Sequence, residues 1–282
     1  MKYFATLLIL LGLFSCQQQS KKTERQPSPT DSTVHHTKDA TALITFGFLN
    51  STGNQVLTLE QDSLDSPQEY NVLIHADGSK QDISYLHPQQ ANEQDNGRQT
   101  AENFKNSKGY LYQVNPSVAQ TEVVAVTLVN STFLKDHTPL PIKPPHSHND
   151  IPDYIQQLSK EKGREIKRHK NLAQIGNQGT ISLVEFEVKD STALAMLIYQ
   201  SPEKIVTQEF AAKYDETSTW RVDDGGEFGM DYFYVLNAFS NRGNVALVTA
   251  DFGAEGYAVQ YLMEKDGKFI LENEAYGYSA PL

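Results

Sequence analysis

The chain has 282 residues, with 24 Lys and Arg against 35 Asp and Glu, and its formal net charge is -11. An acidic chain is a poor partner for nucleic acid, because phosphate contacts need clustered Lys and Arg. The single cysteine excludes an intrachain disulfide and any multi-cysteine zinc or iron–sulfur site.

The first fifteen residues are typical of a secretory signal peptide. Lys2 precedes an almost unbroken apolar stretch over residues 3–14. Such a stretch fits the apolar region of a signal peptide, about 7–15 residues long. It is shorter than the roughly 20 residues that a membrane-spanning helix needs. We therefore expect export from the cytoplasm.

The stretch ends in Leu13-Phe14-Ser15-Cys16, which resembles the lipobox of bacterial lipoproteins. In that family the cysteine carries the lipid, including palmitate, and becomes the mature N-terminus. The resemblance implies that residues 1–15 are removed and that lipidated Cys16 holds the protein at the outer membrane of a Gram-negative cell envelope. It leaves open whether the protein faces the periplasm or the cell surface. The alternative is an ordinary export signal in which Cys16 is incidental.

Residues 16–40 are expected to form a disordered tether. They are rich in Gln, Ser, Thr and Pro, and Val34 is the only clearly apolar residue before Ala40. A segment of this composition cannot bury enough apolar surface to fold. A coil of this length would hold the folded part some tens of ångströms from the membrane.

Residues 41–137 are predicted to form an N-terminal β module. Apolar and β-branched residues separated by turn residues predict strands over residues 42–49, 55–59, 70–75, 81–86, 109–114 and 121–129. Asp77-Gly78 between two of these runs favours a hairpin. The polar stretch over residues 87–108 is expected to be a long, mobile loop.

A Pro-rich linker is predicted over residues 138–149, because four prolines there favour extended backbone. A short helix should follow, with Asp150 as its N-cap and Gly163 at its end. Ile151, Tyr154, Ile155 and Leu158 would share its apolar face.

The rest of the region 150–282 is predicted to be a second β module. Strands are expected over residues 180–188, 193–199, 205–214, 232–239, 244–251, 257–264 and 268–273. Residues 205–214 could instead form a helix that begins at Pro202. The predicted fold is therefore mainly β, with two antiparallel modules of sandwich or meander type joined by the linker and the short helix.

His146-Ser147-His148-Asn149-Asp150 resembles the His-x-His-Asn-Asp opening of glycerophosphodiester phosphodiesterase-like proteins. The resemblance implies that His146 and His148 are metal ligands. The context differs from that family, because prolines precede the motif and about 130 residues are too few for an eight-stranded barrel of about 200 or more. The alternative is a linker whose Asn149 or Asp150 caps the following helix.

A second candidate site combines the only tryptophan with charged residues and glycines. Its members are Trp220, Arg221, Asp223, Asp224, Glu227 and Asp231. The carboxylates could hold Ca2+ or another divalent metal, or they could act as a glycosidase-type acid and base. Nearby tyrosines could stack a sugar or a peptide. The alternative is a glycine-rich turn with solvated charges.

Residues 160–170 are locally basic in an otherwise acidic chain. They could contact anionic lipid headgroups, or they could be the solvated end of the helix, where cations complement the helix dipole.

These features favour a non-enzymatic binding or assembly module for glycan or protein partners, held at the membrane through Cys16. No Gly-rich phosphate loop, Rossmann fingerprint or Gly-x-Ser-x-Gly motif occurs, and no cofactor is predicted apart from a possible divalent metal. The alternative is a metal-assisted hydrolase of phosphodiesters or glycosides, using either His146 and His148 or Asp223, Asp224 and Glu227.

Overall fold

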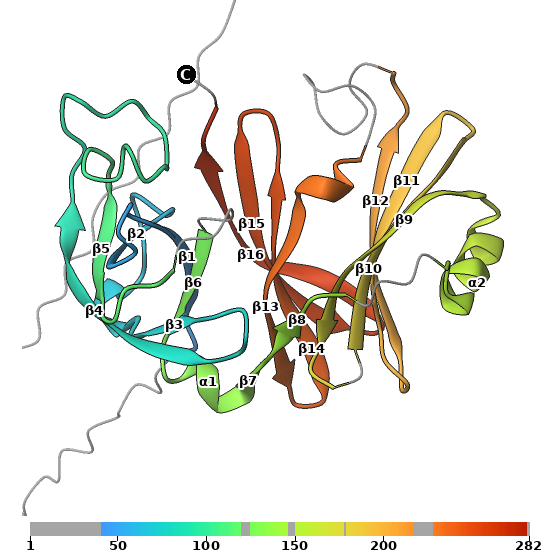
Figure 1. Ribbon diagram of the computed structural model, residues 1–282, viewed down its shortest axis with the longest axis horizontal. Coiled ribbons are helices and arrows are strands. Elements are labelled where there is room, and N and C mark those ends of the chain that lie inside the picture. Colours follow the sequence, from blue (N-terminus) through green and yellow to red (C-terminus); the bar gives the residue numbers. More distant parts are fainter. Residues whose placement is uncertain (1–40, 120–124, 146–149, 178, 217–227, 281–282) are drawn as a thin grey trace, which may run out of the picture. The chain divides into compact units, whose positions relative to one another are not determined.

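The computed structural model describes residues 41–119, 125–145, 150–177, 179–216 and 228–280 (Figure 1). These residues are mainly in β-strands, as the sequence predicts. The strands form two sheets, a closed barrel and a ten-stranded sheet. None of the helices within these ranges is long and apolar enough to span a bilayer.

The first sheet is a closed barrel of six antiparallel strands with the order β1-β2-β5-β4-β3-β6. The strands are β1 (Ile44–Leu49), β2 (Gln55–Thr58), β3 (Val72–Ile74), β4 (Lys80–Gln89), β5 (Gly109–Val114) and β6 (Ala125–Val129). The 3-10 helix η1 (Pro67–Glu69) precedes β3. Every strand contributes to one buried cluster that fills the barrel, formed by Leu49, Val56, Leu73, Ile83, Tyr112, Val114 and Leu128 together with Tyr70. Closure leaves no free strand edge in this sheet.

The second sheet has ten strands with the order β7-β13-β14-β15-β16-β12-β11-β10-β9-β8. Their bounds are β7 (His137–Leu140), β8 (Ile142–Lys143), β9 (Ile166–Ile175), β10 (Gly179–Lys189), β11 (Thr192–Gln200), β12 (Ile205–Lys213), β13 (Phe233–Asn241), β14 (Asn244–Phe252), β15 (Gly256–Lys265) and β16 (Lys268–Tyr278). All pairs are antiparallel except β12 and β16, which meet in parallel at Thr207 and Lys268. The short helices α1 (Phe133–Asp136) and η2 (Met230–Tyr232) precede β7 and β13.

The Pro-rich segment lies within this sheet, whereas the sequence predicted a linker there. Its residues up to Leu140 pair with β13, and Ile142 pairs with Ile175 in β9. One short segment on either side of Pro141 therefore forms both ends of the strand order. This arrangement rolls the sheet around a buried cluster to which β9 to β16 all contribute.

The barrel and the second sheet share a hydrophobic core. Residues on the outer face of the barrel, including Phe46, Phe48 and Leu57, form one buried cluster with Phe239, Val248 and Tyr261 of the sheet. Each fully buried large apolar side chain contributes about 1.5–3 kcal/mol. Residues 40–282 accordingly form one compact unit.

Helix α2 (Asp153–Lys162) covers the outer face of β10 and β11 (Figure 1). Ile155 is fully buried there, in a cluster with Val184, Phe186 and Met196. Gly163 ends the helix with a positive φ of 60°, as its position predicts, because glycine adopts this conformation without steric cost. The prediction that Asp150 is the N-cap is wrong: Pro152 occupies that position, and no side chain caps the helix.

Residues 90–108 form a loop fastened to the end of β16. The backbone N–H of Gln99 donates to the carbonyl oxygen of Tyr278 at 2.8 Å, and the N–H of Tyr278 donates to Oε1 of Gln99 at 2.8 Å. Asn103, which is 1% exposed, donates to Oδ1 of Asp95 at 2.7 Å. The polar residues that suggested a mobile loop are thus the residues that hold it in place.

Candidate functional site

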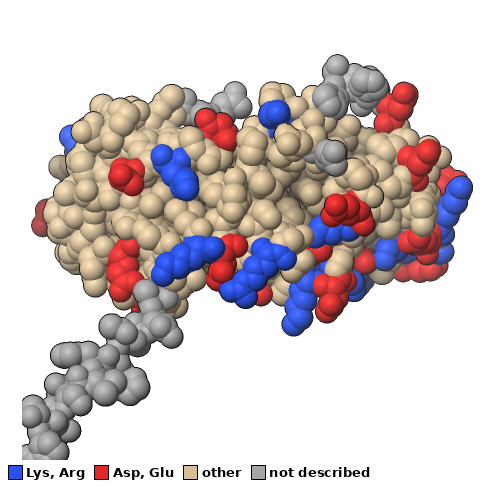
Figure 2. Space-filling view, turned by 90° about the horizontal axis from the view of Figure 1, so that it is seen from below, with Lys and Arg blue, Asp and Glu red and all other residues tan. Residues whose placement is uncertain are grey.

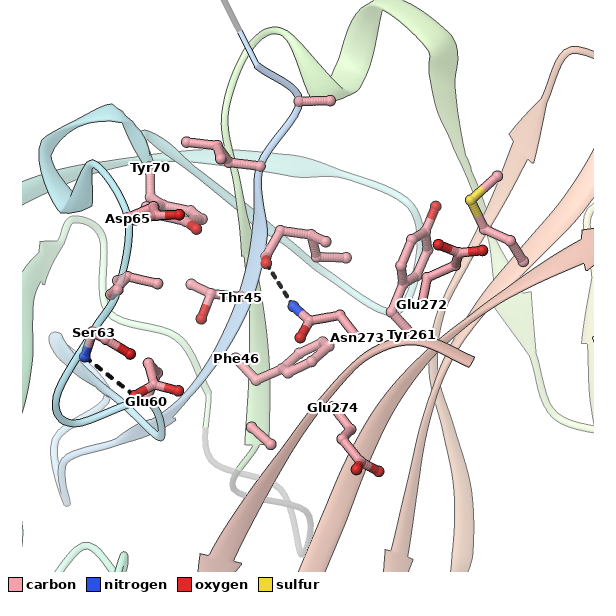
Figure 3. A pocket seen from close by; sticks show the side chains of 16 residues that line it. Thr45, Phe46, Glu60, Ser63, Asp65, Tyr70, Tyr261, Glu272, Asn273 and Glu274 are labelled. Carbon is pink, nitrogen blue, oxygen red and sulfur yellow. Dashed lines mark hydrogen bonds between the residues drawn. The ribbon is translucent and has the colours of Figure 1, made fainter. Parts of the chain in front are cut away.

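A cavity of about 380 Å³ lies where β1 of the barrel meets β15 and β16 of the sheet (Figure 3). We call it the barrel–sheet cavity. Its lining comprises residues 42–46, Glu60, residues 63–65 and Tyr70 from the barrel, and Tyr261, Met263 and residues 272–275 from the sheet. Its volume falls within the roughly 300–1,000 Å³ that is typical of ligand pockets.

A hydrogen bond joins the two sheets at this cavity. Nδ2 of Asn273 in β16 donates to the carbonyl oxygen of Ile44 in β1 at 3.0 Å. The pairing of β15 with β16 is irregular here, because Tyr261 pairs with Asn273 and the next residue, Leu262, pairs with Leu271. Glu272 is therefore the extra residue of a β-bulge, which changes the direction of the neighbouring side chains.

Two residues with hydroxyl groups, Thr45 and Tyr70, also line the cavity. Thr45 is 4% exposed and Tyr70 is 3% exposed, and Figure 3 shows both side chains in the lining. Neither hydroxyl forms a hydrogen bond with any residue in the described ranges. Among the described residues the buried side-chain atoms without a hydrogen-bond partner are Oγ1 of Thr127, Nε2 of His169 and Oε1 of Gln208, and they do not include these two hydroxyls.

The Tyr70 hydroxyl stays protonated at neutral pH. Burial, together with the nearby carboxylates of Asp65 and Glu69, raises the pKa of Tyr70 to about 12. The hydroxyl is therefore neutral and can both donate and accept a hydrogen bond.

Four carboxylates line the cavity: Glu60, Asp65, Glu272 and Glu274. All four residues are exposed, and within the described part of the chain none of them has an ion-pair partner. Glu60 accepts backbone hydrogen bonds from Asp62 at 3.2 Å and from Ser63 at 3.4 Å. The cavity thus has a negative charge that no lining residue balances.

A buried histidine supports one wall of the cavity. The hydroxyl of Tyr261 donates to Nε2 of His137 at 2.8 Å, and Nδ1 of His137 donates to the carbonyl oxygen of Phe133 at 2.9 Å. Because a carbonyl can only accept, the proton of the neutral ring is on Nδ1. Burial lowers the pKa of His137, so the ring is neutral at pH 7.

A second cavity of about 590 Å³ lies between β3 and β13. Apolar residues such as Leu73, Val126 and Leu236 form much of its lining. Ala119 and Ala125 also line it, and they flank residues 120–124, which are outside the described ranges. We therefore assign no function to this cavity.

Most of the site residues that the sequence predicts lie outside the described residues. This holds for Cys16, His146, His148, Trp220, Arg221, Asp223, Asp224 and Glu227. Within the described residues, no group of three or more His, Cys, Asp or Glu side chains is placed to hold a metal ion.

Asp231 is described, and it lies at η2, away from the lining of the barrel–sheet cavity. Its carboxylate forms an exposed ion pair with Nζ of Lys170 at 2.6 Å. The hydrogen bond and the positive charge of Lys170 lower the pKa of Asp231. Asp231 is thus already engaged by a cation from β9.

The basic stretch over residues 160–170 is largely neutralised by acidic residues of the same chain. Lys162 pairs with Glu209 at 2.8 Å, and Lys167 pairs with the buried Glu185 at 3.1 Å. Figure 2 shows basic and acidic side chains mixed over the end of the molecule that carries α2. Residues 166–170 belong to β9 and not to a helix end.

The sequence did not identify the lining of the barrel–sheet cavity as a site. Its residues come from both ends of the folded region, and Thr45 and Tyr70 resemble ordinary strand residues. The only local signal is Glu272-Asn273-Glu274, two acidic residues around an amide on the last strand.

Comparisons of this chain with protein-family models, with curated proteins and with solved structures give no match.

Proposed function

We propose that this protein is a lipoprotein of the Gram-negative envelope that binds glycan or protein partners through the barrel–sheet cavity. In this proposal lipidated Cys16 anchors the chain to the outer membrane and residues 17–40 act as a spacer. The folded unit then works as a binding or assembly module and not as a catalyst.

The observation that carries the proposal is the cavity of about 380 Å³ where the barrel meets the sheet, whose lining includes four carboxylates without an ion-pair partner among the described residues. A cavity of this size with polar groups in its lining is typical of binding sites. The hydrogen bond between Asn273 and Ile44 keeps the two walls in register. Such a preformed site reduces the conformational cost of binding.

Site-specific cross-linking in intact cells tests this proposal. Cys16 is the only cysteine of the chain, so a lipidated Cys16 leaves an introduced thiol as the single attachment point for a photo-cross-linker. Ser63 lines the cavity and is exposed, whereas Ser51 is exposed and is not part of the lining. We expect Ser63→Cys to form an adduct with a defined envelope component, and Ser51→Cys to form none.

Identical adducts from Ser63→Cys and Ser51→Cys would contradict the proposal, because the cavity would then have no special role. Hydrolysis of phosphodiester or glycoside substrates by the purified full-length protein would also contradict it. In that case the metal-assisted hydrolase becomes the better explanation.

A further inference from the structure

We propose that Tyr276 and Tyr278, at the end of β16, form a stacking surface for a neutral glycan. Tyr257 pairs with Gly277, the residue between them, and is buried in the cluster shared with the barrel. Because successive residues of a strand point to opposite faces, Tyr276 and Tyr278 lie on the face away from that cluster. Neither tyrosine lines the barrel–sheet cavity, so this surface is a second site, beyond the proposed function of the cavity.

Two tyrosine–glycine pairs join β15 to β16 on opposite faces of the sheet. On one face the ring of Tyr257 lies against Gly277, and on the other the hydroxyl end of the Tyr276 ring lies against Gly256. A Cβ atom at Gly256 would be 2.9 Å from Cζ of Tyr276, so a larger residue would displace the ring. Each glycine thus lets one aromatic ring approach the backbone of the neighbouring strand closely.

The two pairs differ in what covers the outer side of the ring. The ring of Phe252 stacks on Tyr257, with centroids 5.0 Å apart and an interplanar angle of 25°. Tyr276 is 54% exposed and makes no ring contact with any described residue. Tyr278 is 37% exposed and extends the aromatic surface along the strand. A ligand with an apolar face can therefore stack on Tyr276 as Phe252 stacks on Tyr257.

Hydrogen bonds fix the backbone that carries these rings. The backbone N–H of Tyr278 donates to Oε1 of Gln99 at 2.8 Å, and its carbonyl oxygen accepts from the N–H of Gln99 at 2.8 Å. The N–H of Ser279 donates to the carbonyl oxygen of Glu255 at 2.8 Å. A surface held in place in this way loses little conformational freedom when it binds a ligand.

Polar groups beside the rings suit a sugar. Burial and the nearby carboxylate of Glu255 raise the pKa of Tyr276, so its hydroxyl stays protonated. The exposed Asp251 lies in the same row of the sheet as Tyr276, because each of them pairs with Ala258. A sugar offers an apolar C–H face for stacking and hydroxyl donors for these carboxylates.

The same two carboxylates disfavour other ligands. An acidic sugar would meet like charges at Glu255 and Asp251. An apolar side chain of a protein partner could stack on Tyr276, but it would cover the carboxylates without giving them hydrogen bonds, which is costly. A neutral glycan avoids both penalties.

Isothermal titration of the full-length protein tests the inference, in a detergent without a sugar headgroup such as lauryldimethylamine oxide. The probes are cellohexaose, laminarihexaose and chitohexaose, which are uncharged, and hexagalacturonate, which is acidic. We expect at least one uncharged hexasaccharide to bind and hexagalacturonate to bind at least tenfold more weakly. A short Phe-containing peptide is the probe for a protein partner, and we expect it not to bind.

Variants locate the sugar on Tyr276. Tyr276→Phe keeps a ring beside Gly256 and should retain the affinity within about threefold. Tyr276→Leu covers Gly256 with an apolar side chain but has no flat ring, so the affinity should fall at least tenfold. Ile270→Ala is the matched control, because Ile270 is 41% exposed near the other end of the same strand, and it should leave the affinity unchanged. A urea melt of each variant shows whether its fold is retained.

Binding of no uncharged hexasaccharide would overturn the inference, as would equal affinity for hexagalacturonate or an undiminished affinity in Tyr276→Leu. Binding of the peptide but of no sugar would assign the surface to a protein partner and would also overturn it. If Tyr276→Leu does not fold, saturation-transfer NMR on the unaltered protein decides: saturating the aromatic protons should transfer to the C–H protons of the bound sugar, and no transfer overturns the inference. Adducts at Ser63→Cys report on the barrel–sheet cavity alone, so the two proposals can fail separately.

Discussion

The side-chain amide of Asn273 in β16 donates to the main-chain carbonyl oxygen of Ile44 in β1 at 3.0 Å. This contact spans 229 residues of sequence and joins the barrel to the ten-stranded sheet beside the cavity. The two sheets also bury a common apolar cluster. The unit should therefore unfold as a whole, because separating the two sheets would expose this apolar cluster to water, which is unfavourable.

Replacing Asn273 with Ala removes this hydrogen bond. We expect the free energy of unfolding to fall by about 1–2 kcal/mol, because the half-buried carbonyl of Ile44 loses a donor. Urea denaturation followed by circular dichroism measures the change. The control is Glu274→Ala, on the same strand but exposed, which should change stability by less than about 0.5 kcal/mol. Equal losses of unfolding free energy in both variants would show that this hydrogen bond does not contribute to stability.

Two ion pairs of β9 should differ in their contribution to stability. The side chain of Glu185 is 3% exposed and accepts from Nε of Arg168 at 2.7 Å and from Nζ of Lys167 at 3.1 Å. Replacing Glu185 with Ala leaves these cations without their buried partner. We expect a loss of about 3 kcal/mol in a urea melt.

Asp231 provides the matched comparison for Glu185. Its side chain is 81% exposed, and it pairs with Lys170 of the same strand. Asp231→Ala should cost less than about 1 kcal/mol, because water screens an exposed pair. If Asp231→Ala costs as much as Glu185→Ala, burial does not decide the strength of these pairs.

The buried His137 should make stability depend on pH. Burial lowers its pKa below the ordinary 6.5, with a further lowering by Arg242 and partial compensation by Phe133 and Asp136. Above pH 6.5 the ring is neutral in both the folded and the unfolded chain. Below pH 6.5 the unfolded chain takes up a proton more readily than the folded one, so the free energy of unfolding falls as the pH decreases.

Urea melts between pH 5 and 8 measure this dependence. The pKa of His169 is lowered by burial as well, so it contributes in the same direction. We expect the slope to shrink in His137→Gln, and His87→Gln at an exposed position is the control for the substitution itself. A slope that His137→Gln leaves intact would assign the pH dependence to other groups.

Replacing Cys16 with Ala tests the anchor. The variant lacks the thiol to which the lipid is attached in this proposal. We therefore expect it to incorporate no palmitate label and to leave the membrane fraction, since acyl chains provide the anchoring. The measurement is metabolic labelling with a palmitate analogue, followed by fractionation. A Cys16→Ala variant that still carries the label and remains with the outer membrane would contradict the lipoprotein proposal.

Much of the fold could be predicted from local patterns. Asp266-Gly267 and Asp77-Gly78 mark hairpins that the structure contains, because glycine adopts positive φ at such turns. Within the ambiguous stretch 205–214, Ile205–Lys213 form the strand β12 and not a helix. The alternation of apolar residues in this stretch favours a strand over a helix. Pairing with β11 over the full length of β12 stabilises the strand.

β9 shows where local patterns were insufficient. Its sequence, Ile-Lys-Arg-His-Lys-Asn-Leu-Ala-Gln-Ile, has few apolar residues and resembles a basic helix end. The strand forms because β10 pairs with it and because Glu185 and Asp231 compensate its cations. Glu185 lies 17 residues from Arg168, and Asp231 lies 61 residues from Lys170, so no short window around β9 contains this charge compensation.

The sequence by itself determined the strand-rich class, most of the turns and the residues that resemble a lipobox, because each depends on neighbours a few residues apart. Only the tertiary structure decided that the Pro-rich segment forms both ends of a rolled sheet, that the barrel and sheet share one core, and that Thr45, Tyr70, Glu272 and Glu274 line one cavity. The physical reason is distance along the chain. Pairing order and the burial of distant apolar faces bring these residues together, and neither follows from local periodicity.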